Sequence, residues 1–466
     1  MRLKRKGGYN VPLAGRPAGE IRAPAEADTL WLPLGSRRFA FTQLAVGNGE
    51  AVKTGQVLAT DPANFDVPLL APRDGMVRLG AVEGHVVLEN ASLDPEALDG
   101  RRGPAETHPA HGDGGAKRRA LVRLGAWHFF EDAHTGRLPD PFAAPRAVIV
   151  STVRLEPFLA RGDVQLAGRL DAFARGLEHL QSLLEYQPMF LVAPDVQSEL
   201  AETLHESLRG LAWLQIATVP RRYPMDHFAL VARGLGLKAS GEGAVWAVRT
   251  EGVLAVDRAL GESRPVTERV ISLGGPAVGE PVHLSLPVGY PLEKILLGAV
   301  AEGLPRVLAG GALTGDVLDH AQKGLDAECA GLTVLAEPKR RELFGWLRPG
   351  WDRASYSRCY LSALRRPRPE RLTTAMRGEK RACIACGQCE TVCPARIMPH
   401  AIHKALYADA LDDAERLGVD LCVGCSLCSY VCPSKIELRR EMLEAQARLR
   451  EEREHAEAAK AEEVQG

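Results

Sequence analysis

The chain has 466 residues, of which 45% are hydrophobic, and it carries 58 Lys and Arg against 59 Asp and Glu. This length corresponds to about three domains of roughly 100–200 residues, and cores of that size form without disulfide bonds. The net charge of −1 excludes a globally basic nucleic-acid-binding protein and a strongly acidic disordered chain. The sequence has no run of about 18 apolar residues, so no transmembrane helix is predicted. Residues 1–15 have a basic start without the apolar stretch of a signal peptide, so secretion is not expected.

Residues 1–100 have the composition of a β-rich module. Short apolar runs alternate with Gly, Pro, Asn and Asp, which predicts strands at 29–34, 56–60, 75–79 and 85–88. Two half-motifs, at 46–58 and 71–77, resemble the paired hairpins of a biotinyl/lipoyl-like β-sandwich. A generic β-sandwich is the alternative. No lysine lies between the two halves, so a structural module is predicted and not a swinging-arm carrier.

Residues 101–119 are predicted to form a linker. The glycines at 112, 114 and 115 suggest a phosphate-binding loop, but no strand precedes them. Their spacing also fits neither G-x-G-x-x-G nor G-x-x-x-x-G-K-[ST]. A flexible connector is therefore the preferred interpretation.

Residues 120–255 alternate strand-like and helical patterns. Buried-strand runs occur at 147–152, 189–193 and 214–219, and helical spacing occurs at 166–186 and 196–211. This alternation predicts a Rossmann-like α/β domain with parallel strands. Residues 256–335 return to short strands with Gly and Pro turns, which predicts a β-grasp domain of the SLBB type.

Residues 336–440 begin with a basic, aromatic segment. Positions 339–381 contain 13 Lys and Arg, 4 Asp and Glu, and the rings of Phe344, Trp346, Trp351, Tyr356 and Tyr360. One interpretation is a solvated face with core aromatics, and another is docking to a membrane interface or an acidic partner subunit. A third is nucleic-acid binding, which the near-zero net charge and the lack of a P-loop disfavour. The tail, 441–466, is predicted to be a charged helix that frays into solvent.

Eight of the ten cysteines form the strongest chemical signal. Two copies of C-x2-C-x2-C-x3-C-P lie 39 residues apart, and their cysteines are Cys383, Cys386, Cys389, Cys393, Cys422, Cys425, Cys428 and Cys432. Such spacing is typical of [4Fe–4S] sites, because a cubane needs four soft thiolates from four directions. Three thiolates come from the short turn, and the fourth comes from a distant Cys-Pro.

In two-cluster ferredoxins the fourth cysteine ligates the other cluster. The predicted metal ligands are therefore, for cluster 1, Cys383, Cys386, Cys389 and Cys432, and for cluster 2, Cys422, Cys425, Cys428 and Cys393. A pair of zinc ribbons is disfavoured, because it would leave some of these cysteines without a metal. A disulfide framework is disfavoured because it conflicts with a cytosolic setting. His400 and His403 are not expected to bind iron, because eight thiolates satisfy two cubanes. Cys329 and Cys359 are interpreted as buried thiols.

The segment between the two motifs, 397–417, has the pattern of one helix, so an α-helical dicluster ferredoxin domain is predicted. Two clusters in series without a substrate pocket indicate an electron relay, and no catalytic residue is predicted on this chain.

Several runs outside the cysteine region resemble the A subunit of the Na⁺-translocating NADH:quinone reductase. They lie at 6–15 (KGGYNVPLAG), 125–127, 145–152, 156–160, 267–276 and 342–350 (ELFGWLRPG). An intact dicluster region is a feature of the related C subunit of the Rnf complex, whereas the quinone-reductase proteins usually lack these cysteines. The glycine-rich loop of the Rnf protein is absent, because the chain reads GAWHFFE at 125–131. Direct FMN or NADH binding is therefore not expected.

This resemblance implies an electron-transfer subunit of a membrane-bound, Na⁺-translocating NADH:quinone oxidoreductase that relays electrons through two [4Fe–4S] clusters. Such a protein would lie peripherally on the cytoplasmic face of the bacterial inner membrane. Its partners would be integral membrane and flavin-bearing subunits, with quinone bound at the level of the complex and no nucleic acid. One alternative is the C subunit of an Rnf-type complex, which links ferredoxin and NAD pools. The other is an assembly protein whose clusters are structural only.

Overall fold

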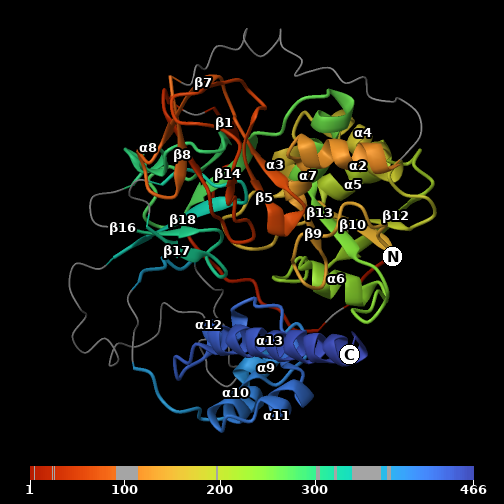
Figure 1. The fold of residues 1–466 in the computed structure, drawn as a ribbon. Helices are drawn as coiled ribbons and strands as arrows, with labels where there is room; N and C mark the ends of the chain where they lie inside the picture. Colours follow the sequence, from red (N-terminus) through yellow and green to blue (C-terminus); the bar gives the residue numbers. More distant parts are fainter. Residues whose placement is uncertain are drawn as a thin grey trace.

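The fold is described from a computed structural model. It covers residues 1–4, 6–23, 25, 27–90, 114–195, 198–300, 305–319, 323–337, 369–374 and 379–465. Most of the predicted linker, most of the basic segment with its run at 342–350, and Cys359 lie outside the described residues. The described chain forms four sheets and a C-terminal helical domain, which lies below the other domains in Figure 1. The predicted mixed α/β, multidomain architecture is confirmed.

Two antiparallel sheets form the N-terminal module. A four-stranded sheet has the order β2-β8-β7-β4, and a three-stranded sheet has the order β3-β5-β6. Their bounds are β2 (Leu30–Pro33), β3 (Gln43–Leu44), β4 (Ala51–Val52), β5 (Val57–Asp61), β6 (Val67–Leu70), β7 (Gly75–Leu79) and β8 (His85–Glu89). Alternating apolar residues such as Leu30, Leu32 and Leu88 are fully buried, as expected for strands with one face on a core. The biotinyl/lipoyl-like assignment stays a prediction.

The next domain is built on a five-stranded sheet of order β12-β11-β10-β13-β9. Its strands are β9 (Phe130–Asp132), β10 (Ala147–Ser151), β11 (Met189–Pro194), β12 (Leu214–Val219) and β13 (Val245–Arg249). Strands β10 to β13 are parallel, as predicted, and β9 is an antiparallel edge strand. The helices are α2 (Gly114–Arg123), α3 (Gly162–Leu166), α4 (Leu170–Gln181), α5 (Glu199–Ser207), α6 (Phe228–Gly234) and α7 (Thr250–Val256). All five residues of β10 are buried, because helices cover both faces of this central strand.

The predicted linker is wrong at its C-terminal end, because residues 114–119 are helical and belong to α2. Lys117 Nζ donates to Ser182 Oγ at 2.9 Å, and Arg118 Nη2 donates to the Leu183 carbonyl at 3.1 Å. Leu121, on the next turn, is fully buried. These contacts with the segment after α4 stabilise a helix that two leading glycines would disfavour in isolation.

A six-stranded mixed sheet follows, with the order β1-β15-β14-β18-β16-β17. Its elements are β1 (Ile21–Arg22), β14 (Glu268–Gly274), β15 (Val282–Pro287), α8 (Leu292–Leu296), β16 (Pro305–Ala309), β17 (Asp316–Leu318) and β18 (Gly331–Ala336). Strand β1 pairs in parallel with β15, so residues near 21 belong to this sheet and not to the N-terminal sandwich that was predicted to start at residue 1. The β-grasp assignment of the sheet stays a prediction.

Residues 1–4 and 6–15 run alongside the later domains (Figure 1). Leu3 N–H donates to the carbonyl of Thr218 in β12, and Gly8 N–H donates to the Val392 carbonyl of the C-terminal domain, both at 2.8 Å. The carbonyl of Gly15 accepts from Gly275 N–H at 2.9 Å. The N-terminal segment therefore links three parts of the molecule through backbone hydrogen bonds.

The C-terminal domain consists of short helices around the two cysteine motifs and one long helix. Its elements are α9 (Gln388–Val392), α10 (Pro399–Tyr407), α11 (Leu411–Arg416), α12 (Leu427–Val431) and α13 (Leu438–Gln465). The single helix predicted at 397–417 is wrong, because α10 ends and α11 begins around Asp409. Asp409 has a φ of 52°, Ala410 N–H bonds the Ala405 carbonyl, and Asp409 N–H bonds the Leu406 carbonyl. This is a Schellman motif, which closes a helix at a left-handed residue.

The predicted boundary between the ferredoxin domain and the tail, at residue 440, lies inside a single helix. Helix α13 begins at Leu438, and its side chains Leu438, Met442, Ala445 and Leu449 are buried. Met442, Ala445 and Leu449 share a core with Ile402 and Ala414. The apolar residues recur every three or four positions, so the first turns of the tail complete the ferredoxin domain.

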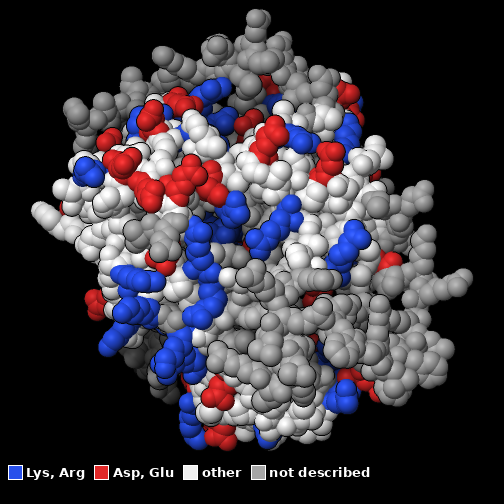
Figure 2. Space-filling view, turned by 180° about the vertical axis from the view of Figure 1, so that it is seen from behind, with Lys and Arg blue, Asp and Glu red and all other residues white. Residues whose placement is uncertain are grey.

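No described helix is both long enough and apolar enough to span a bilayer. Charge is unevenly spread over the surface: on the face opposite to that of Figure 1, Lys and Arg form a descending band and Asp and Glu gather above it (Figure 2).

We predict that Gly7→Ala weakens the attachment of the C-terminal domain. Gly7 has a φ of 83°, and a Cβ atom there would lie 2.3 Å from the Cys393 carbonyl oxygen. The left-handed conformation alone costs a non-glycine residue roughly 1–2 kcal/mol, and the clash adds to this. Denaturant unfolding should show a loss of about 2 kcal/mol or more, with faster proteolysis between the domains. Gly19→Ala is the matched control, because its Cβ would meet nothing within 4 Å; an equal effect of both changes would contradict the prediction.

Candidate iron–sulfur centre

The 39-residue repeat of the sequence is also a repeat of the backbone. Helices α9 and α12 occupy equivalent positions, 388–392 and 427–431. Left-handed residues recur at the same offset, in the pairs Ala385 and Gly424, Gly387 and Ser426, and Arg396 and Lys435. Each cysteine turn therefore bends in the same way, which directs its cysteine side chains and backbone N–H groups to one side.

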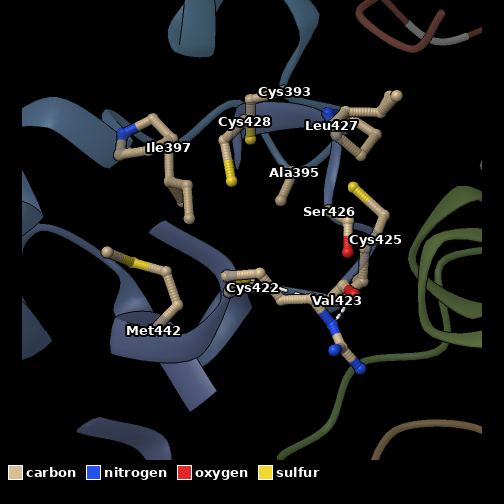
Figure 3. A pocket seen from close by; sticks show the side chains of 14 residues that line it. Cys393, Ala395, Ile397, Cys422, Val423, Cys425, Ser426, Leu427, Cys428 and Met442 are labelled. Atoms are coloured by element: carbon tan, nitrogen blue, oxygen red, sulfur yellow. Dashed lines mark hydrogen bonds between the residues drawn. The ribbon is translucent and has the colours of Figure 1, made fainter. Parts of the chain in front are cut away.

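One cysteine from the first motif meets three from the second around a cavity. Its lining includes Cys393, Cys422, Cys425 and Cys428. In Figure 3 the sulfur atoms of Cys393, Cys425 and Cys428 point toward the hollow, and Cys422 lies on its opposite side. Apolar side chains, among them Ile397 and Met442, complete the wall. These four cysteines are the set predicted for cluster 2.

The four cysteines of this cavity are shielded to different degrees: Cys393 and Cys425 are buried, and Cys422 and Cys428 are partly buried. Burial, and after it the charge of Cys422, raises the pKa of the Cys428 thiol to about 12. Burial likewise raises the pKa of Cys393, Cys422 and Cys425. Four thiolates would therefore not persist here at neutral pH unless cations lay between them. Iron held by these cysteines would supply that charge, and its binding would release the thiol protons.

Backbone N–H groups face the sulfur atoms, as the chemistry of a cluster requires. Gly424 N–H donates to Cys422 Sγ at 3.4 Å. The N–H groups of Ala395, Arg396 and Ile397 point to the Cys393 sulfur and lower its pKa against the effect of burial. Such hydrogen bonds stabilise negative charge on cluster thiolates. The cavity, its donor set and its N–H groups together fit a [4Fe–4S] cluster.

The cysteines predicted for cluster 1 lie outside this cavity. Cys389 and Cys432 are buried, Cys383 is partly buried and Cys386 is exposed. Burial raises the pKa of Cys389, and the charge of Cys386 raises it further. The charge of Cys389 also acts on Cys428, so the two predicted sets lie next to each other. The neighbouring Ile384 is 65% exposed, which makes this the solvent-facing side of the domain.

The histidines near the motifs have polar partners. His403 Nδ1 lies 2.7 Å from Glu441 Oε2, and His400 Nδ1 lies 4.0 Å from Cys389 Sγ. Within the described chain, no three His, Cys, Asp or Glu side chains converge on a point as ligands of one metal ion would. Cys329 is buried, as predicted, and its thiol donates to the Gly331 carbonyl at 3.4 Å.

The second cysteine turn packs against the rest of the protein. A shared core contains Val11, Leu13, Phe158, Tyr223, Val392, Cys425, Leu427 and Val431, drawn from the N-terminal segment, the α/β domain and the ferredoxin domain. Tyr223 Oη donates to the Cys425 carbonyl at 2.9 Å, and Ser426 Oγ donates to the Leu313 carbonyl at 2.5 Å. Sequence reasoning missed these residues, because no local motif marks a contact between positions more than 100 apart.

Comparison with known proteins gives two family matches. Residues 375–433 match a 4Fe-4S dicluster domain, and residues 115–261 match the NqrA second alpha/beta domain. The predicted resemblance is confirmed. The A subunit of the Na⁺-translocating NADH-quinone reductase from Neisseria meningitidis is 29% identical over 434 residues, and that from Pseudomonas aeruginosa is 28% identical over 421 residues. Each alignment covers 89% of this chain and 92% of the relative.

A solved structure, that of an NAD⁺-reducing [NiFe]-hydrogenase in the air-oxidized state, has a TM-score of 0.38 at 14% identity. The alignment covers 50% of this chain and 48% of that chain, and a TM-score of this size does not establish a common fold.

We predict that Tyr223→Phe loosens the contact between the α/β and ferredoxin domains. The change removes the donor to the buried Cys425 carbonyl, and an unsatisfied buried acceptor costs about 1–3 kcal/mol. The free energy of unfolding, measured with denaturant, should fall by this amount, while iron content stays unchanged. Tyr186→Phe serves as control because Tyr186 is 96% exposed; the prediction fails if both variants lose the same stability.

Proposed function

We propose that this chain is an electron-transfer subunit of a Na⁺-translocating NADH:quinone oxidoreductase and relays electrons through two [4Fe–4S] clusters. The observation that carries the proposal is the cavity in which Cys393 joins Cys422, Cys425 and Cys428. The match to a 4Fe-4S dicluster domain and the relatives named as the A subunit of this reductase support an electron-transfer role of this type. When bound, the clusters would supply one-electron transfer, while the chain positions and shields them.

The proposed ligands follow the crossed pattern. Cluster 2 would be held by Cys422, Cys425, Cys428 and Cys393, and cluster 1 by Cys383, Cys386, Cys389 and Cys432. The backbone repeat supports this, because each motif places its Cys-Pro cysteine at the end of a helix that starts in its own turn. Crossing ties both motifs together, so loss of one ligand affects the fold around the other motif.

The two proposed sites differ in exposure, which suits a relay. Cys386 and Ile384 are exposed beside cluster 1, whereas Cys425 of cluster 2 lies in the core shared with the α/β domain. Electrons would therefore exchange with a partner at cluster 1 and continue inward to cluster 2. In the complex, the partners would be integral membrane and flavin-bearing subunits, with quinone bound at the level of the complex and this chain peripheral on the cytoplasmic face.

Crossed ligation predicts which variants share a defect. The anaerobically purified chain should contain about eight irons, as two cubanes require. Cys393→Ser should lose the same EPR signals as Cys425→Ser, and Cys432→Ser the same as Cys386→Ser, because each pair ligates one cluster. Iron should fall toward about half in each variant. Cys329→Ser, which changes a buried cysteine outside the motifs, should keep all the iron. If Cys393→Ser instead resembles Cys386→Ser, each motif holds its own cluster and crossing is wrong.

The relay itself predicts a loss of turnover. In the assembled complex, Cys386→Ser should abolish most NADH-dependent quinone reduction, because cluster 1 is the proposed exchange site. Unchanged quinone reduction would exclude the relay. Clusters that resist dithionite while the intact complex turns over would favour the structural alternative, and NADH oxidation by this chain alone would favour the Rnf-type alternative.

A further inference from the structure

Two arginines approach the cluster 2 cavity from different domains. Arg233, at the end of α6 in the α/β domain, donates from Nη1 to the Leu421 carbonyl at 3.1 Å. Arg439, in α13, lines the cavity and donates from Nε to the Gly424 carbonyl at 2.9 Å. Arg439 Nη2 also lies 3.4 Å from the Thr314 carbonyl, outside the ferredoxin domain. Both guanidinium groups are therefore fixed by backbone carbonyls of or beside the cysteine turn.

The charges of these arginines reach the thiols. Burial lowers the pKa of Arg233, and the negative charges of Asp420, Cys422 and Cys393 raise it. Asp420 is exposed, so solvent screens its opposing charge more strongly than it screens the charge of Arg439 at the cavity wall.

The repeat provides an internal comparison, because the position equivalent to Leu421 in the first motif is Ala382. The Ala382 carbonyl accepts a hydrogen bond from the neutral Ser434 hydroxyl at 3.0 Å. The Leu421 carbonyl accepts from a guanidinium that another domain supplies. The two cysteine turns have the same backbone conformation, but a charged donor binds the equivalent carbonyl in the second turn and a neutral donor binds it in the first.

We propose that Arg233 and Arg439 raise the reduction potential of cluster 2, and that docking of the α/β domain contributes to this increase through Arg233. The inference rests on the proposed function, because it requires a cluster at Cys422, Cys425, Cys428 and Cys393. A reduced cluster carries one more negative charge than an oxidised one, so a fixed positive charge in a poorly solvated site favours reduction. One electron from a donor at the exposed cluster 1 would then pass inward to cluster 2. Both arginines act through the cluster and are positioning residues.

The test is an EPR-monitored redox titration of the full, anaerobically purified chain. Arg233→Gln and Arg439→Gln should each lower the equilibrium constant for reduction of cluster 2 about tenfold, or about 59 mV for a one-electron couple. Cluster 1 should titrate as in the wild type. Arg233→Lys keeps the charge and should retain most of the wild-type potential. Arg416→Gln is the control, because Arg416 is an exposed residue of the same domain paired with Asp413.

The outcomes separate this inference from the proposed function. A wild-type chain without about eight irons contradicts the proposed function, whereas full iron with unchanged potentials in both Gln variants overturns only the inference. Equal shifts of the cluster 2 reduction potential in Arg233→Lys and Arg233→Gln would also overturn it. The hydrogen bond of Arg233, and not its charge, would then set the potential. If Arg233→Gln loses iron, Arg439→Gln and Arg233→Lys are compared instead. A lowered reduction potential of cluster 2 in Arg439→Gln, together with a wild-type potential in Arg233→Lys, supports the inference. Any other combination opposes it.

Discussion

The contact between the second cysteine turn and the α/β domain is the interaction that joins the C-terminal domain to the rest of the molecule. Buried thiols cannot carry charge together without cations between them, so the cluster that we propose at Cys393, Cys422, Cys425 and Cys428 would need both iron and shielding from water. The ferredoxin domain provides the N–H donors and the wall of the cavity. Tyr223 and the N-terminal segment pack behind the second cysteine turn, through the shared core and the bonds to the Cys425 and Val392 carbonyls.

A symmetric repeat thus lies in an asymmetric environment. The two motifs share helix positions and left-handed residues, yet one turn is exposed at Ile384 and Cys386 while the other is buried at Cys425 and Ser426. Identical ligands in different surroundings are how proteins give chemically equal clusters different properties. The direction of electron flow that we propose follows from this difference and not from the cysteines themselves.

Sequence patterns predicted the elements with strong periodicity and failed where packing overrides local preference. Parallel strands at 147–152, 189–193 and 214–219 were predicted because buried runs of that length leave few other structures. The break at Asp409 was missed, because a Schellman motif without glycine has little sequence signal. The pairing of β1 with β15 was missed as well, because two residues carry no periodic pattern that could indicate a partner more than 200 positions away.

By itself the sequence determined the chemistry: eight thiols at a cluster-binding spacing, a mixed α/β chain around them, and a resemblance to a reductase subunit. These are local properties, since spacing and composition are carried by neighbouring residues. Only the tertiary structure decided that Gly7 passes against the Cys393 carbonyl and that Arg233 reaches Leu421. Such juxtapositions depend on how domains pack, because burial and charge act across space between residues that are far apart in the chain.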